Sequence, residues 1–91
     1  MHKANLVAIT EVRNVPPDIL PFVSFRAEVE GRELVQDELV AVLVIDTTTS
    51  YIPVFLRDPP SVKALDEMLS KQDAQLTSEA RAALSRHLGS K

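Results

Sequence analysis

Carboxylates are the main side chains in this chain that could do chemistry, because histidines are few and cysteine is absent. The sequence holds 13 acidic residues and two histidines, His2 and His87, and it has no cysteine. Without cysteine there is neither a disulfide framework nor a thiolate metal site. The two histidines supply little for a zinc site or for histidine-based catalysis. We therefore expect no metal and no cofactor.

Glu28 and Glu30 form a carboxylate pair within a segment that alternates apolar and polar residues. If residues 22–30 form a strand, the two side chains share one face and could converge on a cation. No histidine or third ligand accompanies them in sequence. The preferred interpretation is a solvated strand face whose charges discourage edge pairing.

Residues 44–50, VIDTTTS, are the only motif-like string. An apolar strand ends here at Asp46, and a Thr/Ser turn begins at Thr47. The string resembles the first phosphate loop of the actin-like ATPase and sugar-kinase superfamily, where an Asp organises a metal-bound water. The resemblance implies a small hydrolase or enzyme subunit centred on Asp46, but no glycine loosens the turn and the chain is too short for that two-lobed fold. A hairpin turn in which Asp46 hydrogen-bonds the following backbone is preferred.

The C-terminal segment carries the most basic stretch of an acidic chain. Arg81, Arg86 and Lys91, together with Lys71, could form a helix face that contacts phosphate or a partner. A solvated face is the simpler interpretation. His87 falls on the inner stripe of the same predicted helix, and no nucleophile or acid accompanies it, so we expect no catalytic role.

The aromatic residues offer one candidate binding pair. A platform that stacks RNA bases needs aromatic side chains exposed on a sheet face beside basic residues. Phe25 shares the apolar face of the alternating segment 22–30, so we place it in the core. Tyr51 and Phe55 lie four residues apart on one face of a predicted strand, and they are the plausible exposed pair.

These side chains must be positioned by a small sheet built around residues 39–45. This run of seven apolar residues is too short to span a bilayer. Its β-branched content favours a central strand with both faces covered. Further strands are predicted over residues 6–13, 22–30 and 51–56, and Pro53 makes the last one an edge strand.

Turns and helices complete the prediction. Gly31 permits a turn with positive φ after the alternating segment, and residues 33–38 are left open between strand and helix. Asp58 or Ser61 caps a first helix, and Thr77 caps a second. The inner stripe of the first helix contains Val62, Leu65, Met68 and Leu69.

Strands followed by helices indicate a single α+β domain over residues 1–91. We expect a small antiparallel or mixed sheet of four to five strands, followed by two C-terminal helices packed on one face. The order of the strands stays open.

The favoured function is a small intracellular protein–protein interaction module without catalytic activity: a regulator, adaptor or inhibitor in the cytoplasm. The N-terminal apolar run is too short for a signal peptide, and no membrane association is expected. Candidate partner-binding residues are Tyr51, Phe55, Arg81 and Arg86. A small sheet with excess apolar surface also predicts a homodimer. The alternative is a nucleic-acid-binding module with an OB-like or open-barrel sheet, which the net charge of −3 disfavours.

Overall fold

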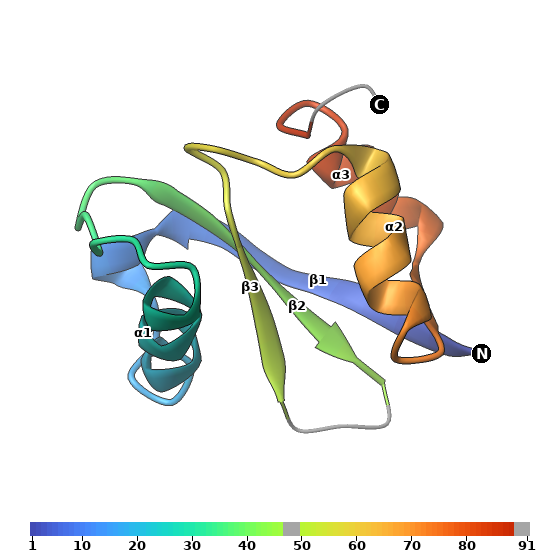
Figure 1. Cartoon of the computed structure of the whole chain (residues 1–91), viewed down its shortest axis with the longest axis horizontal. Helices are drawn as coiled ribbons and strands as arrows, with labels where there is room; N and C mark the ends of the chain where they lie inside the picture. The colour runs from blue at the N-terminus through green and yellow to red at the C-terminus, as the bar shows by residue number, and fades with distance from the viewer. Residues whose placement is uncertain (47–49, 89–91) are drawn as a thin grey trace.

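Four strands form one mixed sheet, and helices cover both of its faces (Figure 1). The computed structural model describes residues 1–46 and 50–88. Within these ranges the elements are β1 (His2–Glu11), a short 3₁₀ helix η1 (Val12–Asn14), α1 (Leu20–Val29), β2 (Leu39–Ile45), β3 (Tyr51–Phe55), α2 (Val62–Ser70), β4 (Ala74–Leu76) and α3 (Ser78–Leu84). The strand order is β3-β2-β1-β4. β2 pairs antiparallel with β1 and β3, and β4 runs parallel to β1. The predicted α+β class is confirmed.

β2 lies in the middle of the packing, as its apolar run predicted. Val40 and Val42 point toward α1 and are at most 1% exposed. Ala41, Leu43 and Ile45 point toward the C-terminal helices and are at most 2% exposed. The strand therefore contributes to two apolar layers, which explains why its sequence is apolar without alternation.

The helices divide between the two sheet faces. α2 and α3 pack on one face through Leu65, Leu69 and Leu84, so the predicted C-terminal pair is confirmed. α1 packs on the opposite face through Val23 and Ala27. Figure 1 shows α1 and the pair α2 and α3 on opposite sides of the sheet. The sequence did not predict the layer that α1 forms.

The predicted strand over residues 22–30 is wrong, because this segment is the helix α1. Val23 and Ala27 are one helical turn apart and face the sheet, whereas Phe25 and Val29 face solvent. The four apolar residues that alternate in the sequence therefore lie on two opposite sides of the helix. Phe25 is 67% exposed and is not in the core. Glu28 and Glu30 lie about 200° apart around the helix axis, so they do not share a face.

The first strand is longer than predicted, and one strand was missed. β1 begins at His2 and has a bulge between Leu6 and Ala8. β4 lies in the connection between α2 and α3, and its backbone pairs with the start of β1. Its three residues are too few to show a strand pattern in sequence.

β3 is an edge strand, as Pro53 predicted. The N–H of Leu56 donates to the carbonyl of Leu39 at 3.1 Å. Hydrogen-bonded and non-hydrogen-bonded pairs alternate in antiparallel ladders. Counting back from this bond in the observed register puts Pro53, opposite Val42, at a non-hydrogen-bonded position. The missing N–H of Pro53 therefore costs the ladder nothing.

Side-chain caps begin both C-terminal helices. Ser61 Oγ accepts from the N–H of Ala64 at 3.0 Å, and Thr77 Oγ1 accepts from the N–H of Ala80 at 3.1 Å. Ser61, and not Asp58, is the cap of α2. Residues 33–38 form neither helix nor strand.

Within residues 1–46 and 50–88, no helix is both long and apolar enough to cross a membrane.

Candidate functional site

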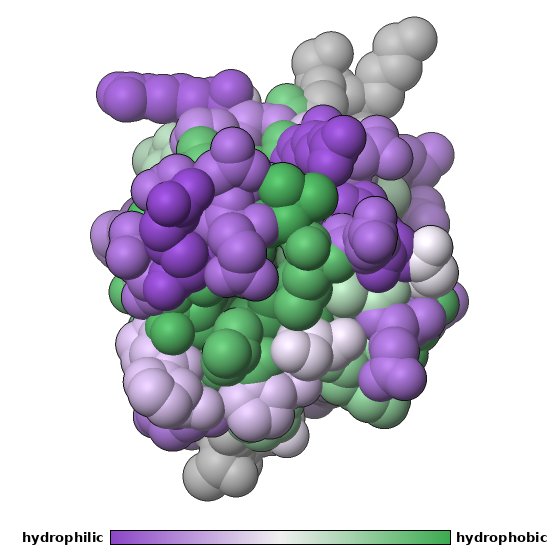
Figure 2. Space-filling view, turned by 90° about the vertical axis from the view of Figure 1, so that its left-hand side faces the viewer, coloured by the Kyte–Doolittle hydropathy of each residue, from purple (hydrophilic) through white to green (hydrophobic). Residues whose placement is uncertain are grey.

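An exposed apolar stripe runs along the outward side of α1. We call it the α1 face, and it consists of Pro21, Phe22, Phe25 and Val29. Phe25 and Val29 are 67% and 59% exposed, although both are large apolar residues. Pro21, Phe22 and Phe25 line a shallow hollow of about 320 Å³. Figure 2 views this side of the molecule and shows an apolar patch with hydrophilic surroundings.

The α1 face is held in place from below and from one side. Val23 and Ala27 anchor the helix on the sheet, at 0% and 3% exposure. The ring of Phe22 meets the ring of Tyr51 edge-to-face, with the centroids 5.4 Å apart. This contact joins the helix to β3, so the stripe sits on a supported helix.

The charges near the α1 face are negative. Asp18 and Glu28 are exposed and lie on the outward side of the helix or just before it. Arg26, the cation of α1 itself, turns away: its Nε donates to Glu30 Oε2 at 2.8 Å, and its Nη2 lies 3.6 Å from Met68 Sδ. The result is an apolar stripe with acidic flanks.

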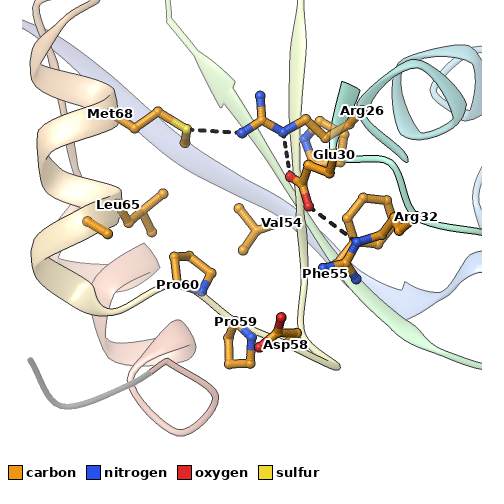
Figure 3. A pocket seen from close by; sticks show the side chains of 12 residues that line it. Arg26, Glu30, Arg32, Val54, Phe55, Asp58, Pro59, Pro60, Leu65 and Met68 are labelled. Atoms are coloured by element: carbon orange, nitrogen blue, oxygen red, sulfur yellow. Dashed lines mark hydrogen bonds and ion pairs between the residues drawn. The ribbon is translucent and has the colours of Figure 1, made fainter. Parts of the chain in front are cut away.

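A second surface follows the outer edge of β3, where Pro53, Val54 and Phe55 are themselves buried. We call it the β3 groove (Figure 3). Its floor is the outer edge of β3 at Pro53, Val54 and Phe55, and its main cavity measures about 330 Å³. One wall is charged and comes from α1 and the turn after it: Arg26, Glu30 and Arg32. The other wall comes from α2 and the loop before it. It is apolar at Pro59, Pro60, Leu65 and Met68, and it carries one carboxylate, Asp58.

Glu30 binds both arginines of the charged wall. Its second oxygen, Oε1, lies 3.2 Å from Arg32 Nε, so one carboxylate serves two guanidinium groups. The guanidinium carbon of Arg32 lies 4.6 Å from the centre of the Phe55 ring, which is a cation–π geometry. These three side chains carry a net charge of +1, and Asp58 of the opposite wall brings the charged lining of the cavity to zero.

Glu38 carries a buried carboxylate. The residue is 8% exposed, and neither carboxylate oxygen accepts a hydrogen bond from the part of the chain that the structure describes. It lies just before β2, where its backbone N–H donates to Val35 and its carbonyl accepts from Val12. Among the described residues, no cluster of three or more His, Cys, Asp and Glu side chains is placed to hold a metal ion.

The structure keeps the predicted aromatic pair on one face of β3, but neither side chain is fully exposed. Tyr51 is half-buried against Phe22. Phe55 is 2% exposed beneath Arg32, so it is not the exposed residue that was expected. Both residues face the α1 side of the sheet; Tyr51 supports Phe22 of the α1 face, and Phe55 lies in the floor of the β3 groove.

The predicted basic residues are also apart from these surfaces. Arg81 Nη2 lies 2.6 Å from Asp66 Oδ1 and ties α3 to α2. Arg86 is exposed in the turn after α3, because the helix ends at Leu84. His87 lies in the same turn and is half-buried, so neither residue belongs to the helix as predicted.

Asp46 directly follows β2 and lies beside the start of β1. Its backbone N–H donates to the carbonyl of Lys3 at 2.9 Å, and its side chain lies 3.7 Å from His2 Nδ1. Thr47, and with it the predicted polar turn, lies outside the described residues.

Sequence reasoning missed the α1 face because it assigned this segment to a strand. Two signals indicated a helix. Pro21 suits the first helical turn. Arg26 and Glu30 have the i, i+4 spacing of a helical ion pair.

Comparison with known proteins gives relationships over nearly the whole chain. The family described as "Domain of unknown function (DUF749)" matches residues 2–88. An uncharacterized protein of Methanocaldococcus jannaschii is 29% identical over 86 residues, which cover 93% of this chain and 76% of that protein. No solved structure matches the chain. Neither of these descriptions names an activity, so function must be inferred from the α1 face and the β3 groove.

Proposed function

The chain belongs to the DUF749 family, and we propose that it is a non-catalytic protein-interaction module that binds another protein through the α1 face. The observation that carries the proposal is the exposure of Phe25 and Val29 beside Pro21 and Phe22. Contiguous apolar patches with polar rims are typical of protein-interaction sites. Aromatic side chains on such patches supply much of the binding free energy.

The proposed occupant is an amphipathic segment of another protein whose apolar residues are flanked by Lys or Arg. Asp18 and Glu28 put negative charge at the edge of the stripe, and Arg26 is held away from it by Glu30. Opposite charges at the rim favour association and suppress like-charged partners. A regulator, adaptor or inhibitor acting in the cytoplasm would use such a surface.

A second copy of the chain is the competing occupant, as the predicted homodimer implies. In a two-fold dimer the same patch meets itself. The acidic flanks would then approach each other, in a molecule whose net charge is already −3. The charges therefore support a basic partner over self-association through this face.

Two synthetic helical peptides test the proposal. Both carry the same leucine stripe, and one has lysines while the other has glutamates at the remaining positions. We expect the lysine peptide to shift the backbone NMR signals of Phe22, Phe25 and Val29, and the glutamate peptide to leave them unchanged. Phe25→Ser should weaken the lysine peptide's affinity roughly tenfold or more. Val7→Ser is the matched control, since Val7 is 45% exposed in β1 and outside the stripe.

Further measurements distinguish the proposed basic partner from a second copy of the chain and from nucleic acid. Equal affinities of the lysine and glutamate peptides would contradict the proposal that the partner is basic. A dimer seen by light scattering at micromolar concentration, and dissociated by Phe25→Ser, would make a second copy the occupant and overturn the proposal. Titration with a single-stranded oligonucleotide at two salt concentrations tests the nucleic-acid alternative.

A further inference from the structure

We propose that the free edge of β1 is an interface between two copies of the chain, which join their sheets by pairing the two β1 strands antiparallel. The free edge is the side of β1 that faces away from β2, over residues 5–11. β4 occupies this side only from His2 to Ala4. Among the described residues, no strand pairs with the remainder of it. Because α1 contacts β3 at the opposite edge of the sheet, the α1 face stays available to its own partner.

The backbone groups of Ile9 and Glu11 point outward along the free edge. The N–H of Val12 donates to the carbonyl of Glu38 at 3.0 Å, so Val12 turns its backbone groups toward β2. This orientation alternates along an antiparallel ladder. Thr10 therefore also bonds to β2, whereas Ile9 and Glu11 turn their N–H and C=O groups away from it. Residues 9–11 are all partly exposed and none is buried, so a second strand can approach these groups.

A two-fold axis through Thr10 would satisfy all of these groups at once. Ile9 of each copy then lies opposite Glu11 of the other, and each of these pairs exchanges two backbone hydrogen bonds. Thr10 lies opposite its own counterpart, where the side chains come closest. It pairs with Val40 within the sheet and therefore faces the layer under α1. Threonines directly opposite each other on paired strands stabilise a sheet by hydrogen bonding.

The α3 side of the free edge has room for the second copy. Ile9 lines a hollow of about 560 Å³ together with residues 82–83, Arg86 and His87. The two residues 82–83 are small and exposed alanines. Ile9 packs against the layer under α2 and α3, and Glu11, two residues further on, points to the same face. In the two-fold arrangement, Glu11 of the second copy would therefore enter this hollow beside Arg86.

The charges around this hollow favour the contact. Arg86 is exposed and forms no ion pair within residues 1–46 and 50–88, and no carboxylate of these ranges lines the hollow. Glu79, at the start of α3, lies outside it. Glu11 is 4.0 Å from Arg13 of its own chain, an exposed pair that contributes little to stability.

A two-fold contact needs a surface that is complementary to itself. The free edge carries both signs of charge, Glu11 and Arg86, so each copy would supply both partners of the two symmetric ion pairs. The α1 face differs in this respect, because its flanks are acidic only. The charges therefore direct a second copy to the free edge of β1 and not to the α1 face.

The competing interpretation is that the free edge stays unpaired. β1 has a bulge between Leu6 and Ala8, and bulges can keep sheet edges from pairing. The bulge lies before the proposed contact, however. From Ala8 to Glu11 the strand keeps a regular register with β2, so the residues of the proposed contact have ordinary strand geometry.

Light scattering on the whole chain, from micromolar to millimolar concentration, is the first test. We expect an equilibrium between monomer and dimer, and a chain that stays monomeric throughout would overturn the proposal. Amide hydrogen exchange then locates the contact. As the dimer forms, the amides of Ile9 and Glu11 should exchange roughly tenfold more slowly, while that of Thr10, already bonded to β2, should change little. A dimer without protection at Ile9 and Glu11 would use another surface and contradict the proposal.

Charge reversal tests the contact between Glu11 and Arg86. Glu11→Lys and Arg86→Glu should each weaken dimerisation roughly tenfold or more, because like charges would then meet. The double variant should restore the dimer, since it re-forms the ion pair with its charges exchanged. Glu67→Lys is the matched control, at an exposed position of α2 and with the same change in net charge as Glu11→Lys. Circular dichroism verifies that each variant is folded.

Two results of the charge reversal would overturn the proposal: a dimer that neither single variant weakens, and a double variant that dimerises no better than the single ones. Phe25→Ser should leave the dimer intact, which separates this interface from the α1 face. A dimer that Phe25→Ser dissociates would assign self-association to the α1 face and contradict the proposal.

Discussion

Arg26 is the residue that gives the two surfaces their different charges. It lies on α1 between the apolar stripe and the β3 groove, and its guanidinium group extends into the groove toward Glu30 and Met68. Glu28, two residues further on, lies about 200° from Arg26 around the helix axis. The positive charge is therefore on the groove side of α1, and the exposed negative charge of Glu28 is on the other side.

Glu38 carries the first prediction at the scale of single residues. Its carboxylate oxygens are buried and have no donor among residues 1–46 and 50–88, and an unpaired polar group in the interior lowers stability. Glu38→Leu should raise the free energy of unfolding by about 1–2 kcal/mol. Urea denaturation followed by circular dichroism measures this change.

Glu33→Leu is the matched control for Glu38. Glu33 is exposed in the same connecting segment, and its replacement should change the stability by no more than about 0.5 kcal/mol. A loss of stability in Glu38→Leu alone would mean that the carboxylate makes a favourable interaction, and the prediction would then be wrong.

Gly31 shows how an element ends, and it carries the second prediction. Its φ is +66°, and the N–H of Arg32 donates to the carbonyl of Ala27 at 2.9 Å, which closes α1 in a Schellman geometry. Gly31→Ala should destabilise the fold by about 1 kcal/mol, because a Cβ disfavours the left-handed region. No atom of the described residues lies within 4 Å of the position for a Cβ, so the cost would come from the backbone alone.

Thermal unfolding of Gly31→Ala and Gly31→Asn tests this reasoning. Asn tolerates the left-handed region better than Ala, so Gly31→Asn should lose less stability. Equal losses in the two variants would show that the conformation of the backbone is not the cause.

At the scale of elements, the sequence predicted β2, β3 and the C-terminal helices but failed at α1. The successful predictions had strong local signals: a continuous apolar run, Pro53 at an edge, and the caps Ser61 and Thr77. α1 lacks a helical period because apolar residues lie on its outward side as well as its inward side. Phe25 and Val29, which break the period, belong to the proposed binding surface. The prediction therefore failed at exposed apolar residues, which the packing of the fold itself does not require.

The parts of the surfaces that sequence reasoning missed depend on contacts between distant segments. The β3 groove joins residues 26–32 with residues 53–68, and no local pattern indicates that these segments meet. The parallel pairing of β4 with β1 is equally non-local. The predicted aromatic pair failed because Arg32, far from Phe55 in sequence, covers its ring.

At the scale of the whole molecule, two apolar layers share one strand. β2 contributes Val40 and Val42 to the layer under α1, and Leu43 and Ile45 to the layer under α2 and α3. Neither layer can keep its side of β2 buried if the strand leaves the sheet. The two layers should therefore unfold together as one cooperative unit.

Tyr51 makes this cooperativity measurable. It is the only tyrosine in a chain without tryptophan, and it lies in the layer under α1. Leu65 is 1% exposed in the opposite layer. Leu65→Ala should lower the free energy of unfolding by about 2–5 kcal/mol, and the Tyr51 fluorescence transition should move by the same amount as the circular dichroism signal. Lys63→Ala, at an exposed position of the same helix, should leave both transitions in place. If Leu65→Ala moves the circular dichroism transition but not that of Tyr51, the layers unfold independently and β2 does not couple them.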